Sequence, residues 1–346
     1  MIRFECDYAE GAHERILNKL LETNFEQTPG YGEDDYCEEA KKAIKKHCEC
    51  EDAYIQFLVG GTQTNLTVIT AALRPHQGVI AAGSGHISTH ESGAIEACGH
   101  KVLALAEENG KLTAAQIEEV CASHAQDESR EHTVQPKMVY ISNPTESGTL
   151  YSKRELEDIS RTCRKNKLYL FLDGARLGYG LTAAGNDLTL PDIARYCDVF
   201  YIGGTKVGAL FGEAVVITNP VLMEDFRYII KQRGGMLAKG RLLGIQFLEL
   251  FCDGLYFEIA AHANKMAMIL KDAFRAYGCD FLIESNTNQQ FPIFEDETLK
   301  ELKKRYSFSY WQRVDETHSA VRFCTSWATK EDEVQKFVNE LNGTKK

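Results

Sequence analysis

The most distinctive chemistry in this sequence comes from a lysine and an aspartate, each placed at the end of a short apolar run. Lys206 follows the run Val199–Ile202 and two glycines, and Asp173 follows the run Leu168–Leu172. Partial burial lowers the pKa of a lysine and makes its amine a nucleophile that can form a Schiff base. A buried aspartate can hold a pyridine nitrogen, so the pair indicates a site for pyridoxal 5'-phosphate (PLP), whereas a solvated lysine at a strand end is the alternative.

A second polar segment follows the apolar run Tyr54–Leu58. Gly60 and Gly61 free the backbone there, and Thr62 opens a predicted helix. Backbone N–H groups at a helix N-terminus beside a hydroxyl group can bind phosphate. The same residues also suit an ordinary turn and helix cap.

Histidine and asparagine side chains follow two further strand-like runs. His86 lies where a ring could stack on another aromatic ring, and His90 would share a helix face with it. Asn143 precedes Pro144 in a predicted turn, where its amide could donate to a phenolate oxygen. Each of these three residues could equally serve a structural role.

Alternating strands and helices predict the fold class. Strands are predicted at Tyr54–Leu58, Gly78–Ala82, Val102–Ala106, Met138–Ser142, Leu168–Leu172, Val199–Ile202 and Ala214–Thr218, and helices at Asp34–Cys48, Leu112–Ala125, Lys153–Lys165 and Leu190–Cys197. This alternation predicts an α/β fold in which a mostly parallel seven-stranded sheet lies between helices. Ligands of such sheets bind outside the carboxyl ends of the strands, where Asp173 and Lys206 are placed.

The C-terminal part of the chain has a different pattern. Lys239–Phe274 reads as one or two long helices, after which the segments FLIE, QQFPIFE, YSFSYWQR and AVRFCTSW look like strands and Asp296–Lys304 and Lys330–Leu341 like helices. We therefore expect an N-terminal arm (residues 1–24), a large domain (25–250) and a smaller α+β domain (251–346).

Composition narrows the class of protein. The 346 residues are 44% hydrophobic and 26% charged, with a net charge of -11, which argues against nucleic acid or an anionic membrane as partner. No apolar run approaches the roughly eighteen residues of a membrane span, and the first residues lack a secretory signal. Eleven scattered cysteines indicate a reducing cytoplasm. Cys37, Cys48 and Cys50 lack a paired second half, so no metal site is expected.

Together these segments resemble the threonine aldolase family, which consists of PLP enzymes of fold type I in the β-eliminating lyase superfamily. The resemblance spans nearly the whole chain, and DGAR with the later lysine is its most specific part. It is carried by Asp7, YGED (Tyr31–Asp34), GGT (Gly60–Thr62), GH (Gly85–His86), DGAR (Asp173–Arg176), TK (Thr205–Lys206) and VRFCTS (Val321–Ser326).

The resemblance implies retro-aldol cleavage of a β-hydroxy-α-amino acid, of the threonine, allo-threonine or phenylserine type, to glycine and an aldehyde. It implies a Schiff base on Lys206, an Asp173 partner for the pyridine nitrogen, a His86 stack over the ring and phosphate contacts from Gly61 and Thr62. Thr205 and Asn143 are further expected cofactor contacts, and substrate contacts are expected from Arg176, Arg322, Asp7 and Tyr31. His132 or His90 is the candidate base for the β-hydroxyl proton.

The chain also departs from the family pattern at three positions. Cys6 stands where many relatives carry serine, His90 where many carry an aromatic residue, and Leu237 where relatives carry an arginine that crosses a subunit boundary. Lys231, Arg233 or Lys239 could substitute for that arginine. These changes affect the expected substrate preference and the contact between subunits, and they leave the PLP chemistry as expected.

Two other readings remain open. One is a different PLP reaction on amino acids, such as β-elimination or transamination. The other is a binding or regulatory protein without turnover, against which the joint presence of Lys206, Asp173 and Arg322 argues. The YGED motif lies in a region that reaches the neighbouring site in relatives, so we expect a homo-oligomer, either a dimer or a tetramer, with sites at the subunit interface.

Overall fold

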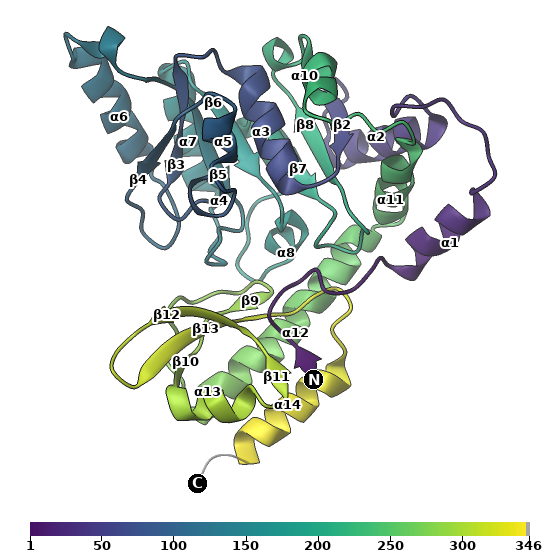
Figure 1. Cartoon of the computed structure of the whole chain (residues 1–346), viewed down its shortest axis with the longest axis vertical. Helices are drawn as coiled ribbons and strands as arrows, with labels where there is room; N and C mark the ends of the chain where they lie inside the picture. The colour runs from purple at the N-terminus through teal and green to yellow at the C-terminus, as the bar shows by residue number, and fades with distance from the viewer. Residues whose placement is uncertain (344–346) are drawn as a thin grey trace.

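A seven-stranded sheet organises the larger part of the chain in the computed structural model, which describes residues 1–343 (Figure 1). Its order is β2-β8-β7-β6-β5-β3-β4, and only β8 runs antiparallel to its two neighbours. The strands are β2 Tyr54–Leu58, β3 Gln77–Ala82, β4 Val102–Leu105, β5 Gln135–Ser142, β6 Tyr169–Asp173, β7 Val199–Gly203 and β8 Glu213–Ile217. The predicted mostly parallel sheet is therefore confirmed, with small shifts at the strand ends.

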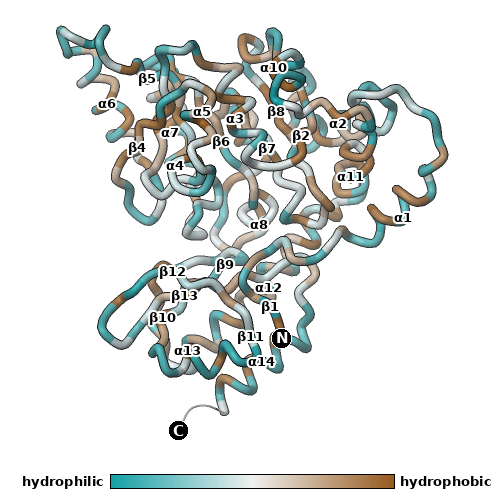
Figure 2. The backbone as a smooth tube through the Cα atoms, in the orientation of Figure 1, coloured by the Kyte–Doolittle hydropathy of each residue, from teal (hydrophilic) through white to brown (hydrophobic). Residues whose placement is uncertain are grey.

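Both faces of this sheet are buried. Successive side chains of each strand point to opposite sides, so each strand contributes to two hydrophobic cores. In β5, Val139 and Ile141 belong to one hydrophobic core, and Met138 and Tyr140 belong to the other. Hydrophobic residues accordingly concentrate along the strands and the helix faces turned toward them (Figure 2). The first core is covered by α2 Asp35–Cys48, α6 Ala114–Gln126, α7 Lys153–Lys165, α9 Leu190–Tyr196 and α11 Arg241–Cys252, and the second by α3 Gly61–Ala72, α4 His86–Thr89, α5 Ala94–Ala97 and α10 Phe226–Gln232.

A long helix, α12 (Leu255–Tyr277), joins the sheet to a smaller C-terminal part (Figure 1). Its first turns pack into the first core through Leu255 and Ile259, and its last turns pack into a third core through Leu270 and Phe274. The smaller part contains β9 Gln289–Gln290, β10 Ile293–Glu295, α13 Asp296–Leu302, β11 Tyr306–Ser307, β12 Ser309–Arg313, β13 His318–Cys324 and α14 Glu331–Gly343.

One predicted strand of this smaller part is wrong. The segment FLIE forms only an isolated bridge between Phe281 and Pro292. Glu284 at its end pairs with Lys271 and Arg275 of α12, at 2.7 and 2.9 Å, so the chain turns onto the helix instead of continuing along the sheet.

The N-terminal arm links the two parts. β1 (Ile2–Arg3) pairs in parallel with β11, and Phe4 is buried in the third core. Further along, α1 (Glu14–Glu22) lies against α11 at the edge of the large part (Figure 1). The remaining short elements are η1 Arg130–His132, α8 Leu177–Leu181 and η2 Pro220–Leu222. Among residues 1–343, no helix combines the length and apolar character that a membrane span needs.

Candidate active site

A cavity of about 810 Å³ lies where the carboxyl ends of the large-sheet strands face the smaller part. Its walls come from the segments that follow β2, β3, β5, β6 and β7, from β12 and β13, and from Tyr8 of the arm. Most of the residues predicted from sequence meet here: Gly61, Thr62, His86, His90, Asp173, Arg176, Thr205, Lys206 and Arg322 all line the cavity.

Lys206 reaches the cavity from the turn after β7. The backbone of that turn is held by Tyr179, whose hydroxyl donates to the Lys206 carbonyl. In the described chain Lys206 Nζ makes no hydrogen bond or ion pair. Burial and the nearby Arg176 guanidinium lower the pKa of Lys206, although Asp7, Asp173 and Glu213 act in the opposite direction. The lowered pKa favours the neutral, nucleophilic amine.

Asp173 is the last residue of β6 and is only 5% exposed. Its Oδ2 accepts hydrogen bonds from the Tyr140 hydroxyl at 2.5 Å and from Asn65 Nδ2 at 3.2 Å. Its Oδ1 accepts from the backbone N–H of Ala175 at 3.0 Å. These neutral donors fix the carboxylate at the cavity, and no cation among residues 1–343 forms an ion pair with it. The carboxylate is therefore available to pair with a protonated ring nitrogen.

Gly174 allows the turn after β6 to pack closely against β7. A Cβ atom on Gly174 would lie 1.9 Å from the carbonyl oxygen of Tyr201 in β7, so no other residue fits there without movement of the backbone. Gly203 N–H in turn donates to the Gly174 carbonyl at 2.9 Å. The Asp-Gly-Ala-Arg turn is thereby held against the strand that carries Lys206.

The N-terminus of α3 forms one end of the cavity. Gly60 is its N-cap, which carries no side chain to satisfy the first N–H groups, and a Cβ atom placed there would meet nothing within 4 Å. These free N–H groups and the positive end of the helix suit a phosphate group. Thr205 also faces this cavity, and its hydroxyl donates to Glu213 Oε1 at 2.9 Å. Burial raises the pKa of Glu213 to about 8, despite the hydrogen bond from Thr205 and the nearby Lys206.

Asn143 provides a further test of whether PLP fits this cavity. Asn143 is fully buried and does not itself line the cavity, although its neighbours Ser142 and Pro144 do. Asn143 Oδ1 accepts from the backbone N–H of Tyr151 at 3.1 Å, whereas Nδ2 is a buried donor without a partner. A buried donor without an acceptor is costly, and a ring oxygen would supply the acceptor. The residues present therefore fit PLP.

His86 begins α4 and is held by two carboxylates. Its Nδ1 lies 2.7 Å from Oε1 of the buried Glu91, and its backbone N–H donates to Glu146 Oε1 at 2.9 Å. The ring of His90 lies edge-on to the His86 ring, with centroids 5.7 Å apart. Both imidazoles therefore lie next to each other at the cavity, and the stacking of His86 on a cofactor ring stays a prediction.

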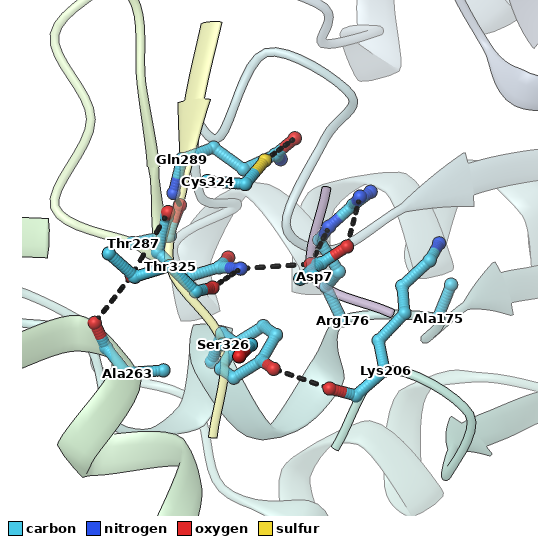
Figure 3. A network of polar contacts seen from close by, with 12 residues as sticks. Asp7, Ala175, Arg176, Lys206, Ala263, Thr287, Gln289, Cys324, Thr325 and Ser326 are labelled. Carbon is cyan, nitrogen blue, oxygen red and sulfur yellow. Dashed lines mark hydrogen bonds and ion pairs between the residues drawn. The ribbon is translucent and has the colours of Figure 1, made fainter. Parts of the chain in front are cut away.

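Asp7, predicted to contact the substrate, has both of its oxygens hydrogen-bonded to Arg176 and does not line the cavity of its own chain. Arg176 Nε and Nη2 lie 2.7 and 2.9 Å from the two Asp7 oxygens, and Asn288 Nδ2 donates to Oδ2 at 2.8 Å (Figure 3). Burial by itself raises the pKa of Asp7, but Arg176 outweighs burial and lowers it to about 2. Asp7 therefore forms a buried ion pair that joins the arm to the large part. Within the described chain, Nη1 is the one side-chain nitrogen of Arg176 that has no partner.

Arg322 enters the cavity from β13 of the smaller part. Its Nη2 donates to the carbonyl of Glu5 at 3.1 Å, and its Nη1 donates to Gln289 Oε1 at 3.3 Å. Arg322 Nε is a buried donor without a partner, and the guanidinium lies 5.6 Å from the ring centroid of Trp311. Because neutral groups alone hold it, its positive charge is available to an anionic ligand.

Two predicted site residues lie elsewhere in the chain. His132 is exposed in η1, before the first residue of β5, whereas the cavity lies beyond the last residue of that strand. Eight strand residues separate the two ends by about 25 Å, so the prediction of His132 as base is wrong for the cavity of its own chain. Tyr31 is 46% exposed and stacks with Lys231 instead of lining the cavity, so its predicted substrate contact is also absent within one chain.

Several residues of the site were not predicted from the sequence. Their side chains meet only through tertiary contacts, although Glu213 could have been noticed as an acid at the start of an apolar strand. They are Tyr8 and Trp311 at the cavity wall, Glu146 and Glu213 as cavity carboxyl groups, and Asn65, Glu91 and Tyr140 behind the wall.

We expect Asp7→Asn to destabilise the fold by about 3 kcal/mol, because it leaves the Arg176 charge buried without a partner. The folded-state pKa of Asp7, about 2, lies below its ordinary value of 3.8, so its stabilisation is complete above that ordinary value and is lost as pH falls through about 2. Urea unfolding at neutral pH measures the change.

The matched control is Asp253→Asn. Asp253 also pairs with an arginine, Arg15, but its side chain is 72% exposed. An exposed pair contributes less than about 1 kcal/mol. Equal losses of unfolding free energy in the two variants would contradict a stabilising role for the buried Asp7–Arg176 ion pair.

Comparison with known proteins agrees with this geometry. A family model described as β-eliminating lyase matches residues 10–297. The chain is 30% identical over 342 residues to a low specificity L-threonine aldolase from Pseudomonas sp. (strain NCIMB 10558), covering 98% of this chain and 96% of that protein.

Two solved structures are also similar to this chain. A threonine aldolase structure from Leishmania major is 48% identical and superposes with a TM-score of 0.96 over 99% of both chains. A structure described as a putative L-allo-threonine aldolase from Listeria monocytogenes EGD-E is 20% identical, with a TM-score of 0.73 over 98% of this chain and 95% of that one, and shows the shared fold alone. The chain therefore belongs to the β-eliminating lyase family and has the type I fold of PLP-dependent enzymes.

Proposed function

We propose that this protein uses PLP to cleave a β-hydroxy-α-amino acid of the threonine type into glycine and an aldehyde. The observation that carries the proposal is the meeting of Lys206, Asp173, His86 and Arg322 in one cavity, at the carboxyl ends of successive strands and opposite the smaller part. The similarity of the whole chain to two threonine aldolases supports this reaction over other PLP reactions.

The residues of the large part would hold the cofactor. PLP, when bound, supplies an electron-withdrawing ring that stabilises the charge left on Cα when a bond to Cα breaks. Asp173, fixed by Tyr140 and Asn65, would pair with the ring nitrogen and keep it protonated. The N–H groups of Gly61 and Thr62 would bind the phosphate. Lys206 would provide the amine for covalent attachment.

The arginines of the cavity would bind the substrate carboxylate. Arg322 has a charge that no acid neutralises among its hydrogen-bond partners, Glu5 O and Gln289. Arg176 has two of its nitrogens committed to Asp7, so only Nη1 is available. We therefore assign the main carboxylate contact to Arg322 and a secondary one to Arg176, with Trp311 closing the wall beside them.

The proposed function includes a homo-oligomer in a reducing, cytoplasmic compartment. Large apolar side chains of the arm and of the large part lie exposed: Phe25 is 95% exposed, Leu21 76% and Tyr228 77%. Exposed apolar groups of this size favour association with a second copy. All eleven cysteines are free thiols, which is consistent with a reducing compartment.

Light scattering tests the oligomer, because we expect a dimer or a tetramer at micromolar concentration. Phe25→Ser should shift the distribution toward smaller species, since it removes an exposed aromatic group. The matched control, Tyr310→Ser, changes an exposed aromatic of the smaller part and should leave the mass unchanged. A fully active monomer would contradict the proposed assembly.

An assay of products tests the reaction itself. The protein with PLP and a β-hydroxy amino acid should release glycine and the corresponding aldehyde in equal amounts. Lys206→Ala should lower the turnover about 10³-fold or more, because it removes the amine that attaches the cofactor. Lys265→Ala, which changes an exposed lysine in α12, is the matched control. Release of pyruvate and ammonia in place of glycine would show β-elimination and refute the proposal.

A further inference from the structure

Two histidines stand side by side in the cavity, yet only one of them is held by a carboxylate. We propose that Glu91 gives them different roles: it fixes His86 as a positively charged ring and so leaves His90 as the neutral base for the β-hydroxyl proton. This inference rests on the proposed function and names the residue that starts carbon–carbon cleavage. Glu91 is a positioning residue here, and His90 is a catalytic one.

The contacts of Glu91 show why it acts on His86. Its side chain is fully buried, and its Oε1 lies 2.7 Å from His86 Nδ1. The other group on Oε1 is the neutral amide of Asn65, whose Nδ2 lies at 2.6 Å. A cationic partner stabilises a buried carboxylate, and His86 is the only ionisable group hydrogen-bonded to Glu91 in the described chain.

The surroundings of His86 favour its charged form. Burial opposes a positive charge on the ring, but the hydrogen bond that the ring donates to Glu91 and the charges of Asp173 and Glu91 outweigh burial and raise the pKa of His86. Lys206 acts in the opposite direction. A ring with protons on both nitrogens cannot accept the β-hydroxyl proton, so His86 is unsuited as the base.

The surroundings of His90 have the opposite effect. Its ring lines the cavity and makes no ion pair with an acid in the described chain. Burial and the charges of His86 and Arg322 all lower the pKa of His90. A neutral imidazole in the cavity that Arg322 also lines is placed to act as a general base.

Carbon–carbon cleavage then begins with a proton transfer to His90. An unprotonated ring nitrogen of His90 takes the proton of the β-hydroxyl group, and the O–H electron pair becomes the second bond of the aldehyde carbonyl. The Cα–Cβ bond breaks, its electron pair stays with Cα, and the aldehyde leaves. A proton delivered to Cα completes glycine, and His90 returns its own proton to solvent.

The deciding experiment compares two reactions of the enzyme loaded with PLP. Cleavage of a β-hydroxy amino acid needs the base, whereas exchange of a glycine Cα hydrogen for deuterium in heavy water involves no β-hydroxyl group. His90→Phe should lower the turnover of cleavage about 10²- to 10⁴-fold and leave the exchange within about twofold of the unchanged enzyme. His132→Phe, an exposed histidine far from the cavity, is the matched control and should change neither rate.

These outcomes separate the inference from the proposed function. If the unchanged enzyme exchanges glycine but cleaves no β-hydroxy amino acid, the proposed function fails. If it does both and His90→Phe cleaves at the normal rate, or loses both reactions equally, then the assignment of His90 as base is wrong.

The role of Glu91 has its own test in pH dependence. In Glu91→Gln, His86 loses its charge partner, so we expect NMR titration to show a lower pKa for His86 and a higher pKa for His90, which then has a less positive neighbour. Because the base must be neutral, the acid limb of kcat/KM should move to higher pH. Glu91→Asp keeps the charge and should keep the limb in place. A limb that stays fixed in a folded Glu91→Gln enzyme would refute the role of Glu91.

Discussion

Burial of charge at the ends of parallel strands is the constraint on which this structure depends. A charged group inside a protein is stable only with a counter-charge or several hydrogen bonds. Around the cavity, Arg176 has Asp7, His86 has Glu91, and Asp173 has Tyr140 and Asn65. Among residues 1–343 Lys206 has no such partner, and its amine is therefore the group that we propose as reactive.

The smaller part and the arm complete the site that the large sheet begins. Arg322 comes from β13, and its guanidinium is held by the carbonyl of Glu5 from the arm and by Gln289. Phe4 anchors the arm in the core of the smaller part, and Asp7 binds Arg176 of the large part. The arm thus couples the two parts at the cavity, so the arginines that we propose as substrate-binding groups are positioned by contacts far apart in the sequence.

The sequence could predict what is local, and it failed where position depends on tertiary contacts. Strand ends carry Asp173 and Lys206, and glycines follow the apolar run of β2, so the sheet and the residues that line this edge of the cavity could be predicted. The ion pair of Asp7 could not be predicted, because nothing near Asp7 in the sequence shows that Arg176, 169 residues later, binds its oxygens. His132 was misassigned because it precedes β5 and lies at the wrong end of that strand.

The central claim is that the turn after β7 delivers the amine that carries the cofactor, and chemical trapping tests it most directly. The protein is incubated with PLP, reduced with borohydride to make any Schiff base permanent, digested, and mapped by mass spectrometry. The account predicts one phosphopyridoxyl group for each chain, on the peptide that contains Lys206. A stoichiometric adduct on any other lysine, or no adduct after reduction, would contradict it.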